Sequence, residues 1–208
     1  MSPRVAMRSL ARYSRAATPW GLTVTTAVIA IVLLSIVARW PAAMWPLHGA
    51  TIGLLAAVSA WSVDERCSAI VDLVPRPLWW RTVARAPAAL LLVAVWVAMH
   101  LSLRDRLPDH LGVLVLQGVS AVLVGFAVAT WQRTRGNPEP GQRMAMLVCP
   151  AAVAIALAKP WSTHVPVFPI WPHENWPRAT AIWSITGGVG VLVLIAAIQR
   201  DAADRAHR

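Results

Sequence analysis

The sequence predicts an all-α, polytopic membrane protein with six transmembrane helices, an N-terminal interfacial helix and a short cytoplasmic helix. Three observations lead to this fold class. Of the 208 residues, 57% are hydrophobic and only 13% are charged, whereas ordinary soluble domains carry about 25% charged residues. The mean hydropathy is +0.57, and the apolar residues gather into six runs. Finally, Lys and Arg are concentrated in alternate connections, as expected of a chain that crosses a membrane repeatedly.

Six apolar stretches have, or approach, the length of a membrane span. A hydrocarbon core about 30 Å thick needs roughly 20 apolar residues in a helix. The fifth stretch is short for a span and contains Pro150. We expect residues 1–208 to form a single transmembrane domain, with spans at about 20–38, 47–62, 86–103, 110–131, 144–158 and 179–198.

The distribution of Lys and Arg predicts the orientation of the chain. Six spans place both termini on the same side, and that side carries fourteen of the nineteen Lys and Arg residues. An excess of positive charge marks the cytoplasmic side, so we expect a multi-pass protein of the plasma membrane with cytoplasmic N- and C-termini. The net charge of +10 then predicts contact with anionic lipid and no binding of nucleic acid.

Residues 1–18 have the pattern of a helix that lies in the membrane interface. Arg4, Arg8, Arg12 and Arg15 fall on one helical stripe, and a basic stripe opposite an apolar one is typical of interfacial helices. A plain basic flank that obeys the positive-inside rule is the alternative. The apolar run that follows is longer than the core of a signal peptide, so we expect it to be retained as the first span.

The cytoplasmic connection 63–85 is longer than a simple turn requires. Cys67, Ile70 and Val74 recur at helical spacing, and Pro75 would end the helix that they predict. Such a helix would either anchor the connection in the interface or dock on a cytoplasmic protein. In the docking interpretation the contacts come from Asp64, Glu65, Cys67, Ile70, Val71, Val74 and Arg76.

The outer connection 159–177 is apolar and aromatic, yet it holds five prolines that exclude a regular helix. Because such a segment would not remain in water as a free loop, we expect a re-entrant segment packed on the outer ends of the helices. A partly ordered interfacial loop is the alternative.

The sequence contains no motif for nucleotide binding, metalloprotease chemistry or acyl transfer. The interiors of the six predicted spans also hold no Asp, Glu, Lys or Arg, although ion-coupled carriers keep such residues at that depth. We therefore expect a chain that is not an enzyme, that holds no cofactor of its own, and that takes any energy for transport from a separate chain.

Histidines gather on the predicted outer side, where five of the six are found. Imidazole and carboxylate groups can converge there on a metal ion, with His164, His173 and Glu174 as the candidate ligands. Their spacing matches no ligand motif, and histidine is also common at membrane interfaces. We expect no metal at these residues, and the metal site stays as the alternative.

Small residues recur at intervals of four in two of the predicted spans, a pattern that lets helix backbones approach closely. The pattern leaves open whether they pack within the chain or between chains. The candidate packing positions are Gly49, Gly53 and Ala57, then Ala121, Gly125 and Ala129, and finally Gly187 and Gly188.

The assembled layout resembles the membrane subunit of ABC-2-type (type V) ABC exporters. Both ends are predicted inside, a helical connection follows the second span, and a pinched apolar segment follows the fifth. The local sequence from Asp64 to Ala69, followed by Val74-Pro75-Arg76-Pro77 and Trp80-Arg81, is similar to the first cytoplasmic loop of small permeases common in actinobacteria.

The resemblance implies a permease that moves an apolar or amphipathic substrate and works with separate cytoplasmic ABC ATPase subunits. It implies that residues 64–74 form the coupling helix that docks on the ATPase, that ATP and Mg are bound by that partner, and that a second permease chain completes the transporter. The alternative is an integral-membrane scaffold or accessory subunit of another complex, with a His-rich metal site on its outer face.

Overall fold

The computed structural model describes residues 11–64, 77–107, 110–157, 167–169 and 175–206, and all regular structure in these residues is helical. The prediction of an all-α fold is confirmed for this part of the chain. Residues 11–17 form a short helix, and two 3-10 turns, η1 (Pro41–Ala43) and η2 (Arg104–Arg106), follow the ends of helices. The longer helices are α2 (Trp20–Arg39), α3 (Met44–Trp61), α5 (Leu78–Ser102), α6 (Leu111–Thr134), α7 (Pro140–Leu157) and α8 (Trp176–Ala206).

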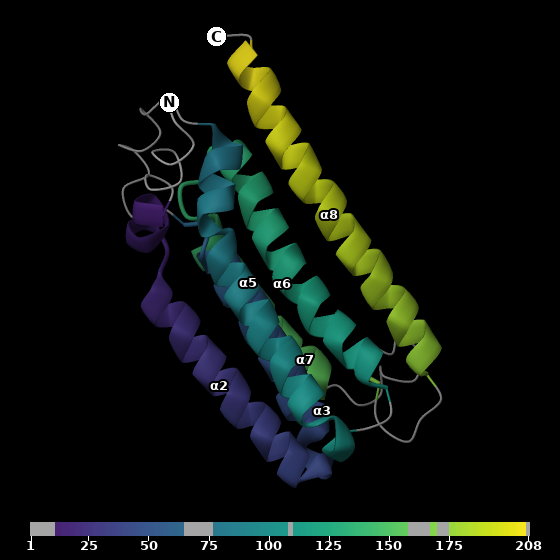
Figure 1. Ribbon diagram of the computed structural model, residues 1–208. Helices are drawn as coiled ribbons and strands as arrows, with labels where there is room; N and C mark the ends of the chain where they lie inside the picture. The colour runs from purple at the N-terminus through teal and green to yellow at the C-terminus, as the bar shows by residue number, and fades with distance from the viewer. Residues whose placement is uncertain (1–10, 65–76, 108–109, 158–166, 170–174, 207–208) are drawn as a thin grey trace.

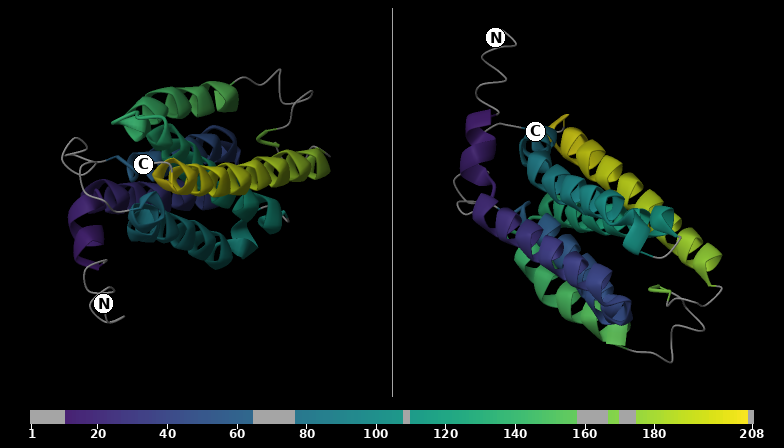
Figure 2. Two further views of the ribbon diagram at one scale, coloured as in Figure 1. Left: turned by 90° about the horizontal axis from the view of Figure 1, so that it is seen from above. Right: turned by 60° about the horizontal axis from the view of Figure 1, so that its bottom comes forward.

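The six long helices run up and down in one bundle, so that consecutive helices point in opposite directions (Figure 1). We call the end where α2 begins the proximal end. At this end α5 and α7 also begin, and α3, α6 and α8 finish. The other end, which carries η1 and η2, is the distal end. The first described residues and the end of α8 therefore lie at the same end of the bundle, and the 11–17 helix turns away from the axis of α2 (Figure 2).

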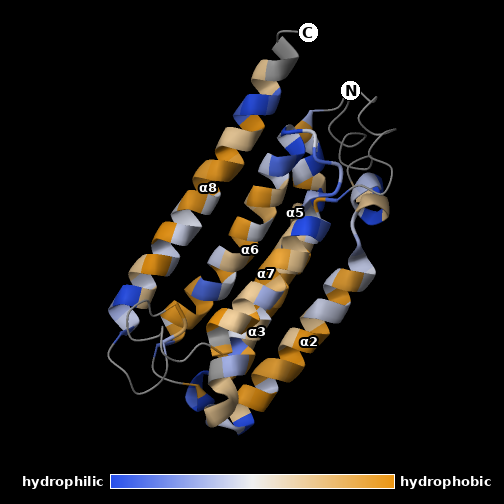
Figure 3. Cartoon of the chain, turned by 180° about the vertical axis from the view of Figure 1, so that it is seen from behind, coloured by the Kyte–Doolittle hydropathy of each residue, from blue (hydrophilic) through white to orange (hydrophobic). Residues whose placement is uncertain are grey.

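Four helices are long and apolar enough to cross a membrane: α2, α5, α6 and α8. Helix α3 contributes a shorter apolar stretch, Pro46–Trp61. Hydrophobic residues occupy the middle of the bundle and hydrophilic residues gather toward its ends (Figure 3). These helices indicate a membrane protein, as the composition predicted.

The observed helix bounds differ from the predicted spans most clearly at the start of α5. This helix begins at Leu78, whereas the sequence predicted a span from residue 86. Pro77 directly precedes the helix and has an extended conformation (φ −64°, ψ 148°). Pro87 therefore lies in the interior of α5 and not in its first turn. The predicted span starts later than the helix, because two arginines in the first turns of α5 lower the local average hydropathy.

Two other boundaries also extend beyond the predicted spans. Helix α7 begins at Pro140, where proline is favoured in the first helical turn, and not near residue 144. Helix α8 continues to Ala206, past the predicted end at residue 198. In both cases the helix continues past the apolar run, because helical hydrogen bonding does not end where the side chains become polar.

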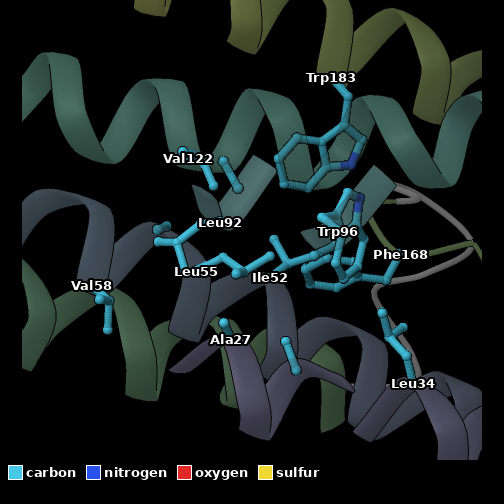
Figure 4. Close-up of a cluster of buried hydrophobic side chains, with 13 residues drawn as sticks. Ala27, Leu34, Ile52, Leu55, Val58, Leu92, Trp96, Val122, Phe168 and Trp183 are labelled. Carbon is cyan, nitrogen blue, oxygen red and sulfur yellow. The ribbon is translucent and has the colours of Figure 1, made fainter. Parts of the chain in front are cut away.

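The core lies between α3, α5 and α6, with α7 packed mainly on α3 and α8 mainly on α6. Helix α2 covers the neighbouring faces of α3 and α5. A cluster of buried aliphatic and aromatic side chains fills the centre (Figure 4). The members of this cluster that carry the largest side chains are Leu34, Ile52, Leu55, Leu92, Trp96, Phe168 and Trp183.

Two glycines allow helix backbones to approach closely. A side chain at Gly53 of α3 would collide with Ala152 of α7, and one at Gly125 of α6 would collide with the backbone of Ala56 in α3. Both contacts are within the chain, which is one of the two possibilities that the small-residue pattern left open.

The remaining predicted packing positions lie in different surroundings. Gly49, Ala57, Ala121 and Ala129 are buried. Gly187 lies against Ser120 of α6, whereas Gly188 is exposed and has no atom within 4 Å of a Cβ built on it. Most of the predicted packing positions are therefore packed against neighbouring helices, whereas Gly188 is exposed.

Candidate partner-docking site

The candidate docking site lies at the proximal end, around the connection from α3 to α5. Residues 65–76 lie outside the described residues, so that Glu65, Cys67, Ile70, Val71, Val74 and Arg76, which were predicted to contact a partner, have no described position. The structure describes the two ends of this connection, residues 62–64 and Pro77 onward. How these ends are held determines what a docked partner could move.

Asp64, the first residue of the predicted docking set, binds the start of α7. One of its carboxylate oxygens accepts a hydrogen bond from the backbone N–H of Gly141 (2.7 Å), and the other accepts one from Gln142 (2.8 Å). The first N–H groups of a helix lack partners within it, and an acidic side chain satisfies them well. The carboxylate thus caps a helix 77 residues further along the chain.

The surroundings of Asp64 act on its pKa in opposite directions. Burial raises the pKa of this carboxyl above its ordinary value of 3.8, and the hydrogen bonds from Gly141 and Gln142 oppose that increase. Glu139 raises the pKa further and Arg85 lowers it, and the net shift is upward. A proton is therefore held more tightly here than in an unfolded chain.

Arg85 holds the same end of α3 from the side of α5. The residue is 2% exposed, and its guanidinium donates a hydrogen bond to the backbone carbonyl of Val63. A second N–H donates to the hydroxyl of Tyr13, at 3.5 Å, and the Tyr13 ring packs on Trp80, with ring centroids 4.9 Å apart. The start of α5 is thus tied both to the end of α3 and to the 11–17 helix.

The far end of the connection is held by α8. The backbone N–H of Leu78, the first residue of α5, donates to a carboxylate oxygen of Asp201 at 2.9 Å. A negative charge beside the first turn of a helix is stabilising, because the unpaired N–H groups there carry partial positive charge. The connection between α3 and α5 therefore enters and leaves the bundle at anchored residues.

The α6–α7 connection at the same end is closed by an arginine as well. Arg133 donates hydrogen bonds to the backbone carbonyls of Asn137 (3.4 Å) and Pro138 (3.0 Å). Gly136 takes a left-handed conformation in this turn (φ 78°), which glycine adopts without strain. The turn sets the start of α7 beside Asp64.

A cavity of about 410 Å³ opens beside Asp64, between the N-terminal segment and the end of α3. Its lining includes Arg15, Trp20, Trp61 and Asp64. A guanidinium and two indole rings at the end of a membrane bundle are suited to a lipid headgroup, because aromatic rings and basic side chains favour that depth.

Sequence reasoning missed the buried arginines and the role of Asp201. A signal for the arginines was present, because most of the buried residues of α5 fall on one stripe at spacings of three and four. The stripe contains Leu78, Arg81, Arg85, Ala88, Leu92, Trp96 and His100. Extending the period of the apolar face backward from Trp96 reaches both arginines, whereas no local pattern links Asp201 to Leu78.

The three described histidines of the predicted outer group all lie in the distal half of the bundle, in different surroundings. His164, His173 and Glu174 lie outside the described residues. His110 is exposed and stacks on Trp176, with ring centroids 4.3 Å apart, whereas His48 and His100 are buried inside the bundle. Within the described part of the chain, no three His, Cys, Asp or Glu side chains are grouped to hold a metal ion.

The all-helical fold and its four long apolar helices indicate that this chain belongs to the class of helical membrane proteins. Compared with known proteins, it matches no family model, no curated protein and no solved structure.

Proposed function

We propose that this chain is the transmembrane permease subunit of an ATP-driven exporter. It moves an apolar or amphipathic substrate with energy from separate ABC ATPase subunits, which bind ATP and Mg. The observation that carries the proposal is the anchoring of the connection 65–76 at both ends. A partner that binds this connection is mechanically joined to the bundle through Asp64, Arg85 and Asp201.

Anchoring of this kind supports coupling between a docked partner and the helices, because the ends of the connection cannot move without the helices that hold them. A displacement at residue 64 pulls directly on the start of α7 and, through the Val63 carbonyl, on α5. A displacement at Leu78 acts on α8 through Asp201. Since packed helices shift between discrete arrangements and do not deform smoothly, force applied at one short segment can move several spans together.

The proposed topology has six spans, with the proximal end in the cytoplasm of a plasma-membrane protein. The proximal end holds the buried Arg85 and Arg133 and the exposed Arg12 and Arg15, in agreement with the positive-inside rule. The 11–17 helix lies in the cytoplasmic interface and contacts anionic lipid. A second permease chain packs beside this one to complete the transport path.

We expect a gene beside that of this chain to encode an ABC ATPase. The test is the double substitution Ile70→Asp and Val74→Asp in the full-length chain, co-expressed with that ATPase. Short helices dock through a few buried side chains, each costing about 2 kcal/mol or more when lost. We expect the variant to enter the membrane normally, to lose co-purification of the ATPase, and to lose stimulation of ATP hydrolysis.

The matched control is Ala202→Asp with Ala203→Asp, which adds the same two acids to exposed positions at the same end of the bundle. This variant should keep the ATPase. If the Ile70 and Val74 variant is folded and recovers the ATPase at the wild-type yield, docking through 65–76 is wrong, and a scaffold or accessory subunit is the better description.

A further inference from the structure

Two histidines are buried side by side in the distal half of the bundle, away from the proposed docking site. His48 of α3 is 4% exposed and His100 of α5 is 1% exposed. Their ring centroids are 5.9 Å apart, and the indole of Trp96 packs against both, at 5.2 Å from His48 and 4.2 Å from His100. Neither imidazole takes part in the proposed coupling.

The hydrogen bonds around His48 determine which of its nitrogens carries the proton. The carbonyl of Val167 can only accept, so the group of Gln117 that faces it at 3.4 Å is the amide N–H. The oxygen of the same amide then faces His48 Nε2, at 2.7 Å. An amide oxygen can only accept, so Nε2 donates, and Nδ1 of the neutral ring carries a lone pair.

The same reasoning applies to His100. Its Nδ1 lies 2.9 Å from the backbone carbonyl of Trp96 and therefore donates to it. Nε2 of the neutral ring is then the nitrogen with the lone pair. Within the described residues, neither His48 Nδ1 nor His100 Nε2 has a hydrogen-bond partner. Two nitrogens that carry lone pairs, on different helices, are thus buried without a hydrogen-bond donor among the described residues.

Buried polar atoms without partners are uncommon, and a bound species that accepts their electron pairs is one explanation. Metal–imidazole bonds are about 2.0–2.1 Å long, so two nitrogens that share an ion lie at most about 4.2 Å apart. Ring centres 5.9 Å apart can bring ring nitrogens within that distance. The rings are also steeply inclined to each other, at 77°, so that they can share an ion without stacking.

We propose that His48 Nδ1 and His100 Nε2 bind one Cu(I) ion inside the bundle. The described part of the chain places no third His, Cys, Asp or Glu beside them to complete a larger ligand set, which favours an ion that is stable with two ligands. No described carboxylate is grouped there to balance a second positive charge, and buried charge is costly in a membrane.

The experiment uses the purified full-length protein in detergent, with Cu(I) supplied from a chromophoric chelator complex under reducing, oxygen-free conditions. We expect one Cu(I) per chain, and X-ray absorption should show two imidazole nitrogens as the ligands. Loss of a second-shell group typically lowers metal affinity 10–100-fold, so removing a ligand should lower it more than about 100-fold. His100→Phe is the first variant, because phenylalanine keeps a ring beside Trp96.

The matched control is His110→Ala, which removes an exposed imidazole at the same end and should leave binding unchanged. Wild-type protein that takes up no stoichiometric Cu(I) overturns the proposal whether or not the variants fold, and a buried water would then be the partner of the two nitrogens. Binding that persists in His100→Phe, or a preference for Zn(II) over Cu(I), overturns it as well. This inference is independent of the exporter proposal, because it does not involve the ATPase.

Discussion

The two ends of the bundle are joined by different chemistry. At the proximal end, charged side chains bind helix termini: Asp64 caps α7, Asp201 caps α5, and Arg85 binds the last turn after α3. In the distal half, neutral groups such as Gln117 and the indole of Trp96 cross between helices.

The difference follows from how polar the surroundings of each set of contacts are. Charged groups are tolerated near the ends of membrane helices, where lipid headgroups and water are close, whereas they are costly at depth. Charge-assisted hydrogen bonds are also stronger than neutral ones. The proximal end is therefore built from few, strong and directional contacts, and the distal half from several weaker ones that pack well.

The largest expected effect comes from Arg85→Met, which tests the charged end. Methionine keeps much of the side-chain length but leaves the Val63 carbonyl and the Tyr13 hydroxyl without this donor. Hydrogen bonds to charged groups contribute about 1.5–3 kcal/mol, so we expect a loss of roughly 3 kcal/mol in the free energy of unfolding. Denaturation in mixed micelles would measure it.

Arg104→Met is the control for this change, because Arg104 is an exposed arginine at the distal end. Exposed substitutions usually alter stability by less than about 0.5 kcal/mol. Equal effects of the two variants would mean that the contacts of Arg85 do not hold the proximal end together.

A smaller effect is expected from Gln117→Leu, which tests the neutral half. The substitution removes the acceptor for His48 and the donor to Val167. Hydrogen bonds between membrane helices average about 0.6 kcal/mol and reach about 1.7 kcal/mol, so a loss of roughly 1 kcal/mol in the unfolding free energy follows. The same denaturation assay applies, with the exposed Gln199→Leu as control. A loss as large as that of Arg85→Met would remove the contrast between the ends.

The smallest effect is a pH dependence at Asp64. Because burial raises the pKa of this carboxyl in the folded protein, the folded state binds the proton more tightly than the unfolded state. The contribution of Asp64 to stability is therefore greatest below its unfolded pKa of 3.8 and falls as the pH rises through the raised value. Asp64→Asn should reduce this slope.

Thermal midpoints measured from pH 3.5 upward in steps would show the change, with Asp105→Asn as the control at an exposed distal acid. A midpoint that rises with pH in the wild type but not in Asp64→Asn would indicate that the hydrogen bonds from Gly141 and Gln142 outweigh burial. The cap would then stabilise the ionised form.

The sequence by itself determined the helical class, the approximate position of the apolar helices, and the concentration of basic residues in alternate connections. These features depend on local composition and on the 3.6-residue period, so a window of about 20 residues contains the information. The stripe from Trp96 back to Arg81 could also have been found in the sequence, because the helical period alone reaches it, although it was not predicted.

Only the tertiary structure decided the partners of the polar side chains. Asp64 binds the start of α7, which lies 77 residues further along the chain. Leu78 binds Asp201, which lies 123 residues further along. His48 contacts His100 only because α3 and α5 lie side by side there. No local pattern encodes these pairs. Each pair forms because the packing of the whole bundle brings two distant parts of the chain together.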